Sequence, residues 1–128
     1  MTDYRDVTRR LDRGMQAFGR AHPSAMGAFG ALMDATTGAD GALDLRTKEL
    51  IAFAIGIAAR CDGCIGHHAK AVAHAGASRG EVVEAIGVAV LMGGGPSVVY
   101  GTQALAAFDT FAEEPPFADG ETPVRERA

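Results

Sequence analysis

Apolar residues recur at steps of three and four along almost the whole chain, and no other feature of the sequence constrains the fold as strongly. Val7, Leu11 and Met15 give a clear example. A helix with about 3.6 residues per turn places residues with this spacing on one face. No stretch shows the sustained two-residue alternation, bounded by hairpin turns, that marks a half-buried strand. The sequence therefore predicts an all-α protein.

Capping and turn residues divide this pattern into about six helices. Ser78 followed by Glu81 is a capping-box pattern, Asp44 is a candidate N-cap, and Gly76 suits the end of a helix. The third helix is apolar on most of its faces, so we expect it to be central. The predicted helices cover residues 4–20, 24–36, 45–60, about 63 to the sequence HAGAS, 78–92 and 96–113.

The length of 128 residues is that of one domain. We assign residues 1–113 to a single helical domain. Residues 114–128, which contain three prolines, are expected to form a loose tail or an arm on a neighbouring subunit. Hydrophobic residues make up 48% of the chain, and helices this apolar in a small subunit favour association into a homo-oligomer.

Charge and composition argue against several classes of protein. The formal net charge is -4 and there is no run of Lys or Arg, so nucleic acid is not an expected partner. The N-terminal residues lack the apolar segment of a signal peptide, and no apolar run reaches the roughly 20 residues that span a bilayer. Two cysteines three residues apart fit a reducing cytoplasm better than a secreted disulfide framework. We expect a cytoplasmic protein without a membrane partner.

The sequence ARCDGCIGHHAK, residues 59–70, concentrates the residues with chemical potential. Cys61 and Cys64 are close enough along the chain to form a disulfide. His67 and His68 follow Cys64 by three and four residues, so a helix places both on or near its cysteine-bearing face. A thiol at a helix start is influenced by the helix dipole, and a nearby imidazole can accept its proton. The stretch is therefore redox-competent.

Structural zinc is the main alternative, and inert burial of the cysteines is another. Cys61, Cys64 and His68 would supply three ligands, with Glu49 or His74 as the fourth. A second Cys-x-x-Cys and a paired His-x-x-x-His are both missing. Spacing alone favours a redox pair but leaves structural zinc and inert burial open.

Glu49 is the one acidic residue in the interior of the apolar third helix. Its ordinary interpretation is a first-turn carboxylate that reaches solvent. In one straight helix it would lie about 18 Å from Cys61. It can approach the cysteines only if the chain bends back between the third and fourth helices, which Gly63 and Gly66 would permit.

The segment from Leu43 to Ser78 is similar to a known protein family. The segment LDLRTKELIAFAIGIAARCDGCIGHHAKAVAHAGAS resembles the core of the alkyl hydroperoxidase D-like proteins of the carboxymuconolactone decarboxylase family. The shared pattern is Glu, eleven residues, Cys, two residues, Cys, three residues, His, and the likeness covers roughly residues 23–111. The matching positions are Glu49, Cys61, Cys64 and His68.

The resemblance implies an all-helical subunit that forms trimers or hexamers and acts as a thiol peroxidase on organic hydroperoxides or hydrogen peroxide. It implies that Cys64 attacks, that Cys61 resolves, and that His68 and Glu49 relay the proton. No bound cofactor is implied, but an external dithiol, from a lipoylated or a thioredoxin-like partner, must reduce the pair. The true decarboxylases of the family lack the cysteine pair, so Cys61 and Cys64 favour the peroxidase branch. A decarboxylase-like enzyme on the same scaffold and a zinc-stabilised assembly protein without catalysis are the alternatives.

The sequence departs from some family members between the two cysteines, where Asp62 and Gly63 replace a motif with a further histidine. An anion beside the pair raises thiol pKa values slightly, so we expect weak turnover.

The remaining polar candidates are more ordinary. We expect His67 to support the site or an interface, and His74 and His22 to lie on a helix surface or at a helix end. Tyr100 and Gln103, three residues apart in the last helix, would line a pocket or belong to the core or an interface.

Overall fold

The computed structural model of the chain describes residues 2–114, and within them it contains α-helices and no strand. The predicted all-α fold is confirmed. Of the C-terminal tail assigned to residues 114–128, Glu114 caps the end of α6, and residues 115–128 lie outside the described range. The helices are α1 (Tyr4–Ala21), α2 (Pro23–Thr37), α3 (Leu45–Ala58), α4 (Asp62–His74), α5 (Arg79–Gly93) and α6 (Gly95–Glu113).

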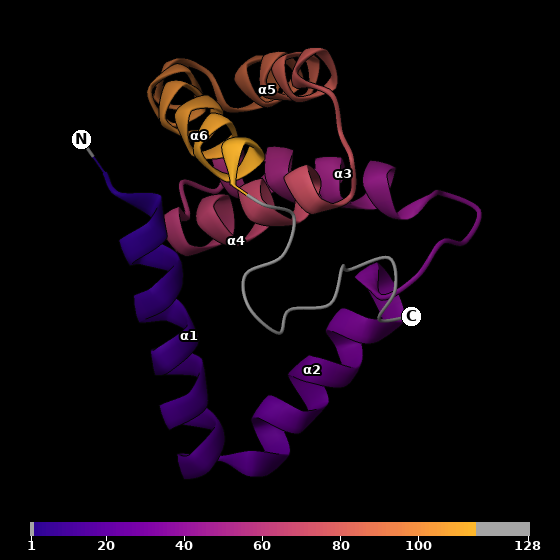
Figure 1. Ribbon diagram of the computed structural model, residues 1–128, viewed down its shortest axis with the longest axis vertical. Coiled ribbons are helices and arrows are strands. Elements are labelled where there is room, and N and C mark those ends of the chain that lie inside the picture. The colour runs from indigo at the N-terminus through magenta and orange to yellow at the C-terminus, as the bar shows by residue number, and fades with distance from the viewer. Residues whose placement is uncertain (1, 115–128) are drawn as a thin grey trace.

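Helices α3 to α6 lie together, and α1 and α2 extend from them and meet at their far ends in a V (Figure 1). Helix α4 packs against α1, α3 and α6, so it lies near the centre of the subunit. Side chains from α1, α3, α4, α5 and α6 form the core. The largest fully buried apolar ones are Phe53 and Ile57 on α3, Ile65 and Val72 on α4, and Val82 on α5.

Local sequence explains most of the helix boundaries. Asp44 caps α3 by accepting a hydrogen bond from the Thr47 N–H, and Ser78 and Glu81 form the predicted capping box at the start of α5. Gly76 follows α4 with a φ of 82°, a left-handed conformation that favours glycine. The caps predicted from the sequence are therefore confirmed.

The third helix packs against α2, α4, α5 and α6, as a central helix should, but one of its faces is exposed. Phe53 and Ile57 are fully buried, whereas Ile51 and Ile55 are 45% and 62% exposed. Helix α2 has no buried residue, although Phe29 and Leu32 lie on it. One subunit does not supply enough neighbours to cover these apolar helices.

Candidate redox site

The turn between α3 and α4 differs from the sequence prediction. Helix α3 ends at Ala58 rather than Arg60, because Arg60 adopts a φ of 57° in the left-handed region. This conformation costs a non-glycine residue about 1–2 kcal/mol. The chain reverses at Arg60 and Cys61, so Gly63 and Gly66 do not provide the bend that was expected of them.

The two glycines of α4 instead allow α1 to approach closely. A Cβ atom on Gly66 would lie 3.0 Å from Thr8 and 3.3 Å from the ring of Tyr4, and one on Gly63 would lie 3.4 Å from Leu11. Helix α1 therefore covers the cysteine-bearing end of α4 across positions without side chains.

The reversal makes α3 and α4 run back along each other, and this brings Glu49 to His68. Glu49 Oε2 lies 2.7 Å from His68 Nδ1, and the two side chains are 3% and 20% exposed. The interpretation of Glu49 as a carboxylate that reaches solvent is thus wrong. A carboxylate this deeply buried requires a hydrogen-bonding partner, and His68 is one.

Cys61 and Cys64 form a disulfide at the start of α4, with their Cα atoms 5.2 Å apart. Cys61 is the N-cap, and its Sγ accepts a hydrogen bond from the Cys64 N–H at 3.2 Å. Cys64 packs against α3, where a Cβ atom on Gly56 would lie only 3.0 Å from the Cys64 Cβ. In the reduced pair, the hydrogen bond from the Cys64 N–H and the helix N-terminus would stabilise negative charge on the Cys61 sulfur. The sequence had indicated Cys64, three residues later, as the thiol at the helix start.

The structure therefore gathers all four predicted site residues around the α3–α4 hairpin. The zinc alternative receives no support from this geometry. Within residues 2–114, no group of three or more His, Cys, Asp or Glu side chains is placed to hold a metal ion. His74, one of its candidate ligands, lies in the last turn of α4.

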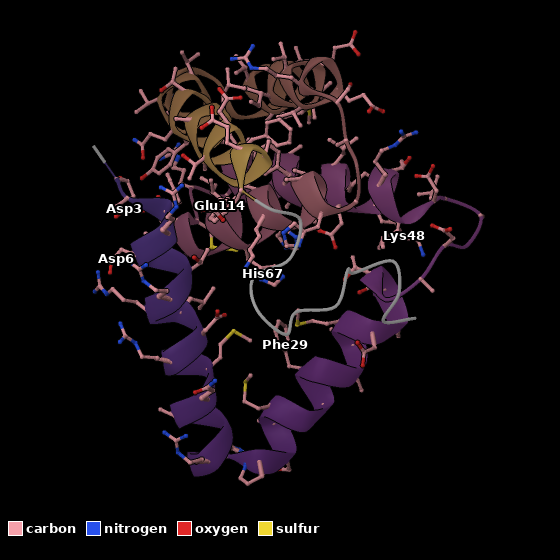
Figure 2. All side chains as sticks on the ribbon, viewed as in Figure 1. Asp3, Asp6, Phe29, Lys48, His67 and Glu114 are labelled. Atoms are coloured by element: carbon pink, nitrogen blue, oxygen red, sulfur yellow. A yellow bond between two sulfur atoms is a disulfide. The ribbon has the colours of Figure 1, made fainter. Side chains whose placement is uncertain are left out.

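A cavity of about 230 Å³, lined in part by Glu49, lies between the first four helices. His67 and His74, which were expected to be ordinary helix or interface residues, both line it. Figure 2 shows His67 on the side of α4 that faces the space between α1 and α2. The ring centroids of His67 and His68 are 4.8 Å apart, and the two rings meet edge to face. Glu49 thus contacts His68 and also forms part of the cavity wall. The polar residues of the wall, besides Glu49, are Thr8, Asp12, Asp34, Thr37, His67, Lys70 and His74.

Sequence reasoning missed Tyr4. Its side chain is 4% exposed, and its hydroxyl lies 3.0 Å from Asp62 Oδ1 and 3.1 Å from Gln103 Oε1. Burial raises the pKa of Tyr4, and the hydrogen bond to Asp62 raises it further. Tyr4 lies outside the segment with the family pattern; the available signal was that the chain has only two tyrosines, and one of them begins a helix. Gln103 is thus a partner of Tyr4, and Tyr100 packs against the core.

None of the helices in residues 2–114 combines the length and the apolar character that crossing a membrane requires.

Comparison with known proteins gives consistent matches. The model of the carboxymuconolactone decarboxylase family matches residues 23–107. The crystal structure of the apo form of a carboxymuconolactone decarboxylase family protein from Legionella pneumophila superposes with a TM-score of 0.82 at 42% sequence identity, over 86% of this chain and 97% of that one.

Two curated relatives are uncharacterized proteins. One, from Cupriavidus necator, is 38% identical over 108 residues, which are 84% of this chain and 95% of the relative. The other is uncharacterized protein 4 in the cox locus of Paracoccus denitrificans, 44% identical over 71 residues, which are 56% of this chain and 64% of the relative. Their names assign no activity.

Proposed function

Since the chain belongs to the carboxymuconolactone decarboxylase family, we propose that it is a thiol peroxidase that reduces organic hydroperoxides or hydrogen peroxide through Cys61 and Cys64. The observation that carries the proposal is the disulfide between these residues at the start of α4, on the same α3–α4 hairpin that holds the hydrogen-bonded Glu49 and His68. A disulfide that spans three residues and lies at a helix N-terminus suits a cycle of oxidation and reduction better than the stapling of a fold.

The cycle oxidises the two thiols to one disulfide and reduces the hydroperoxide by two electrons. The family pattern assigns the attack to Cys64 and the resolving role to Cys61, although the helix start also favours a thiolate on Cys61. The Cys64 thiolate attacks one oxygen of the hydroperoxide, the O–O bond breaks, and the alcohol, or water in the case of hydrogen peroxide, leaves after taking up a proton. Cys64 then carries a sulfenic acid. The Cys61 sulfur attacks Cys64, a disulfide forms, and the sulfenic oxygen leaves as water. An external dithiol supplies the two electrons that restore both thiols.

His68 and Glu49 are proposed to move the protons. His68 follows Cys64 by one turn of α4, and Glu49 holds the Nδ1 side of its ring at 2.7 Å. A carboxylate that accepts a hydrogen bond from Nδ1–H keeps the proton on Nδ1 and leaves Nε2 as the basic nitrogen, as a general base requires. The reductant is proposed to be a lipoylated or thioredoxin-like protein, because either presents a dithiol, and the reaction is proposed to take place in the cytoplasm.

Titration of free thiols with cumene hydroperoxide tests the proposal. One equivalent should remove both thiols of the reduced chain. Cys64→Ser should abolish hydroperoxide consumption, and Cys61→Ser should accumulate a sulfenic acid on Cys64 that a dimedone probe labels.

Three results would overturn it. If both single variants consume hydroperoxide at the parent rate, the cysteines are not the reacting groups. Zinc that survives dialysis, with thiols unreactive until a chelator is added, would support the assembly-protein alternative. An enzymatic activity that survives Cys61→Ser combined with Cys64→Ser would indicate a decarboxylase-like enzyme.

We also propose that the subunit associates with copies of itself into a trimer or hexamer. Support comes from the exposed apolar side chains on α2 and α3 and at the end of α5, where Leu91 and Met92 are 80% and 77% exposed. Light scattering on the purified chain measures the assembly, and a monomer at micromolar concentration would contradict it.

A further inference from the structure

We infer that Tyr4 is a positioning residue that holds the carboxylate of Asp62 and thereby keeps the adjacent cysteine pair reactive. The inference rests on the proposed redox role of this pair. It assigns a function to a hydrogen-bonded group, formed by Tyr4, Asp62 and Gln103, that joins α1, α4 and α6 at the cysteine-bearing end of α4.

The position of Asp62 is unfavourable for thiolate formation in the cysteine pair. It is the first residue of α4, directly after Cys61 and two residues before Cys64, and its side chain is exposed. A carboxylate near a thiol disfavours the thiolate, which is the reactive form. An exposed aspartate without a fixed partner would be able to rotate toward either sulfur.

The hydrogen bond from Tyr4 restricts this carboxylate. The Tyr4 hydroxyl donates to Asp62 Oδ1, which directs that oxygen toward α1 and α6 and places a donor proton on it. Because burial and Asp62 both raise the pKa of Tyr4, the phenol stays protonated through the neutral range. It is therefore a permanent donor.

Gln103 completes the group. A phenol has one proton, so Tyr4 cannot donate to both Asp62 and Gln103 at once. If the amide of Gln103 is turned so that its NH₂ group faces Tyr4, the amide donates to the phenol oxygen and the phenol proton goes to Asp62. The phenol then donates to Asp62 and accepts from Gln103, so both contacts of its oxygen are hydrogen bonds.

Packing keeps Tyr4 in this position. The Tyr4 ring lies against Gly66, where a Cβ atom would approach the ring to 3.3 Å. The Asp3 side chain caps the start of α1 directly before Tyr4. The tyrosine is therefore fixed by its helix and by α4, and the exposed aspartate is the member of the pair that is held.

Other groups also act on the cysteines, and they are left in place by the experiment below. Arg60 precedes Cys61 in the turn, and Tyr100 on α6 interacts electrostatically with Tyr4. His67 and His68 are further titratable groups on α4, and His68 contacts Glu49 on α3.

A double-mutant cycle on the full chain tests the inference. The reduced protein is alkylated with iodoacetamide between pH 5 and 10, and the rate at each cysteine is followed by mass spectrometry. We expect Tyr4→Phe to slow alkylation at pH 7 by about two- to tenfold and to move the pH midpoint upward, the size of effect that one charge has on a nearby thiol close to the surface. In the Asp62→Asn background, Tyr4→Phe should have no effect.

An equal effect of Tyr4→Phe in both backgrounds, or no effect in either, would refute the inference, since it would show that Tyr4 acts by packing or not at all. If Tyr4→Phe lowers the folded fraction by circular dichroism, Gln103→Met tests the same group. The phenol proton is then committed to Asp62, so alkylation should be at least as fast as in the parent, and slower alkylation would count against the proposal. Alkylation needs no hydroperoxide, so this result is independent of whether the protein is a peroxidase.

Discussion

Replacing Gly56 by Ala tests whether Cys64 is seated on α3. Gly56 lies in the last turn of α3, and a Cβ atom there would be 3.0 Å from the Cys64 Cβ and 3.6 Å from the Ile65 N. The Cys64 Cβ cannot swing aside, because it is the first atom of a side chain tied into a disulfide at the helix start. Relief of the contact would require α4 to move.

The magnitude follows from two opposing effects. Alanine gains up to about 1 kcal/mol over glycine in a helix. Overpacking of a close contact costs about 1–3 kcal/mol. We therefore expect Gly56→Ala to lower the free energy of unfolding by about 1 kcal/mol.

Gly87→Ala is the matched control. Gly87 is exposed within α5, and an added Cβ atom would meet no other atom within 4 Å. It should raise the free energy of unfolding by up to about 1 kcal/mol, since only the helix-propensity gain remains. The difference between the variants, about 2 kcal/mol, isolates the cost of the contact with Cys64.

Urea unfolding of the oxidised proteins at one chain concentration measures both variants. For m-values of about 1–3 kcal/mol/M, a difference of 2 kcal/mol separates the midpoints by about 1 M. If the two variants are stabilised equally, the close packing of α4 on α3 at Gly56 is wrong.

Three further predictions concern the site and the pH dependence of stability. Glu49→Gln should reduce hydroperoxide turnover by up to about 10²–10⁴-fold, the contribution of general acid–base groups, without loss of the disulfide; stopped-flow thiol oxidation measures it, and an unchanged rate would remove Glu49 from the relay. The pKa of Tyr4 is raised in the folded state, so the stabilisation from Tyr4 is present below the ordinary tyrosine value near 10 and is lost as the pH rises further. Tyr4→Phe should therefore flatten the alkaline loss of stability in denaturant titrations. An identical loss in the variant would show that Tyr4 does not cause it. Hydrogen bonding from the Ser78 N–H lowers the pKa of Glu81, so the stabilisation from Glu81 is present above the ordinary glutamate pKa and is lost as the pH falls. Glu81→Gln should lack this acid loss of stability in thermal unfolding between pH 3 and 7. A loss like that of the parent would show that the capping box does not produce it.

Helix positions and caps were predictable because their causes are local. The capping box at Ser78, the N-cap at Asp44 and the glycine turn at Gly76 depend on residues within one turn of each other, and all three occur in the structure. The same holds for the closeness of Cys61 and Cys64, which lie three residues apart.

The part of the site that depends on chain reversal was less predictable. The spacing of Glu49 and His68 matched a family pattern, but it did not indicate that the carboxylate would be buried, nor that Arg60 would make the turn in a left-handed conformation. Glycine was the expected turn residue because it carries no steric penalty there. Packing between α3 and α4 offsets the penalty at Arg60, and the glycines are used where helices approach most closely.

The sequence by itself determined the helices, their caps and the closeness of the two cysteines, because each follows from backbone preferences and contacts within a few residues. Only the tertiary structure decided that Glu49 lies against His68 and that Tyr4 binds Asp62, 58 positions away. Such contacts arise when whole helices pack to bury their apolar faces, and the register of that packing is a property of all the buried side chains together.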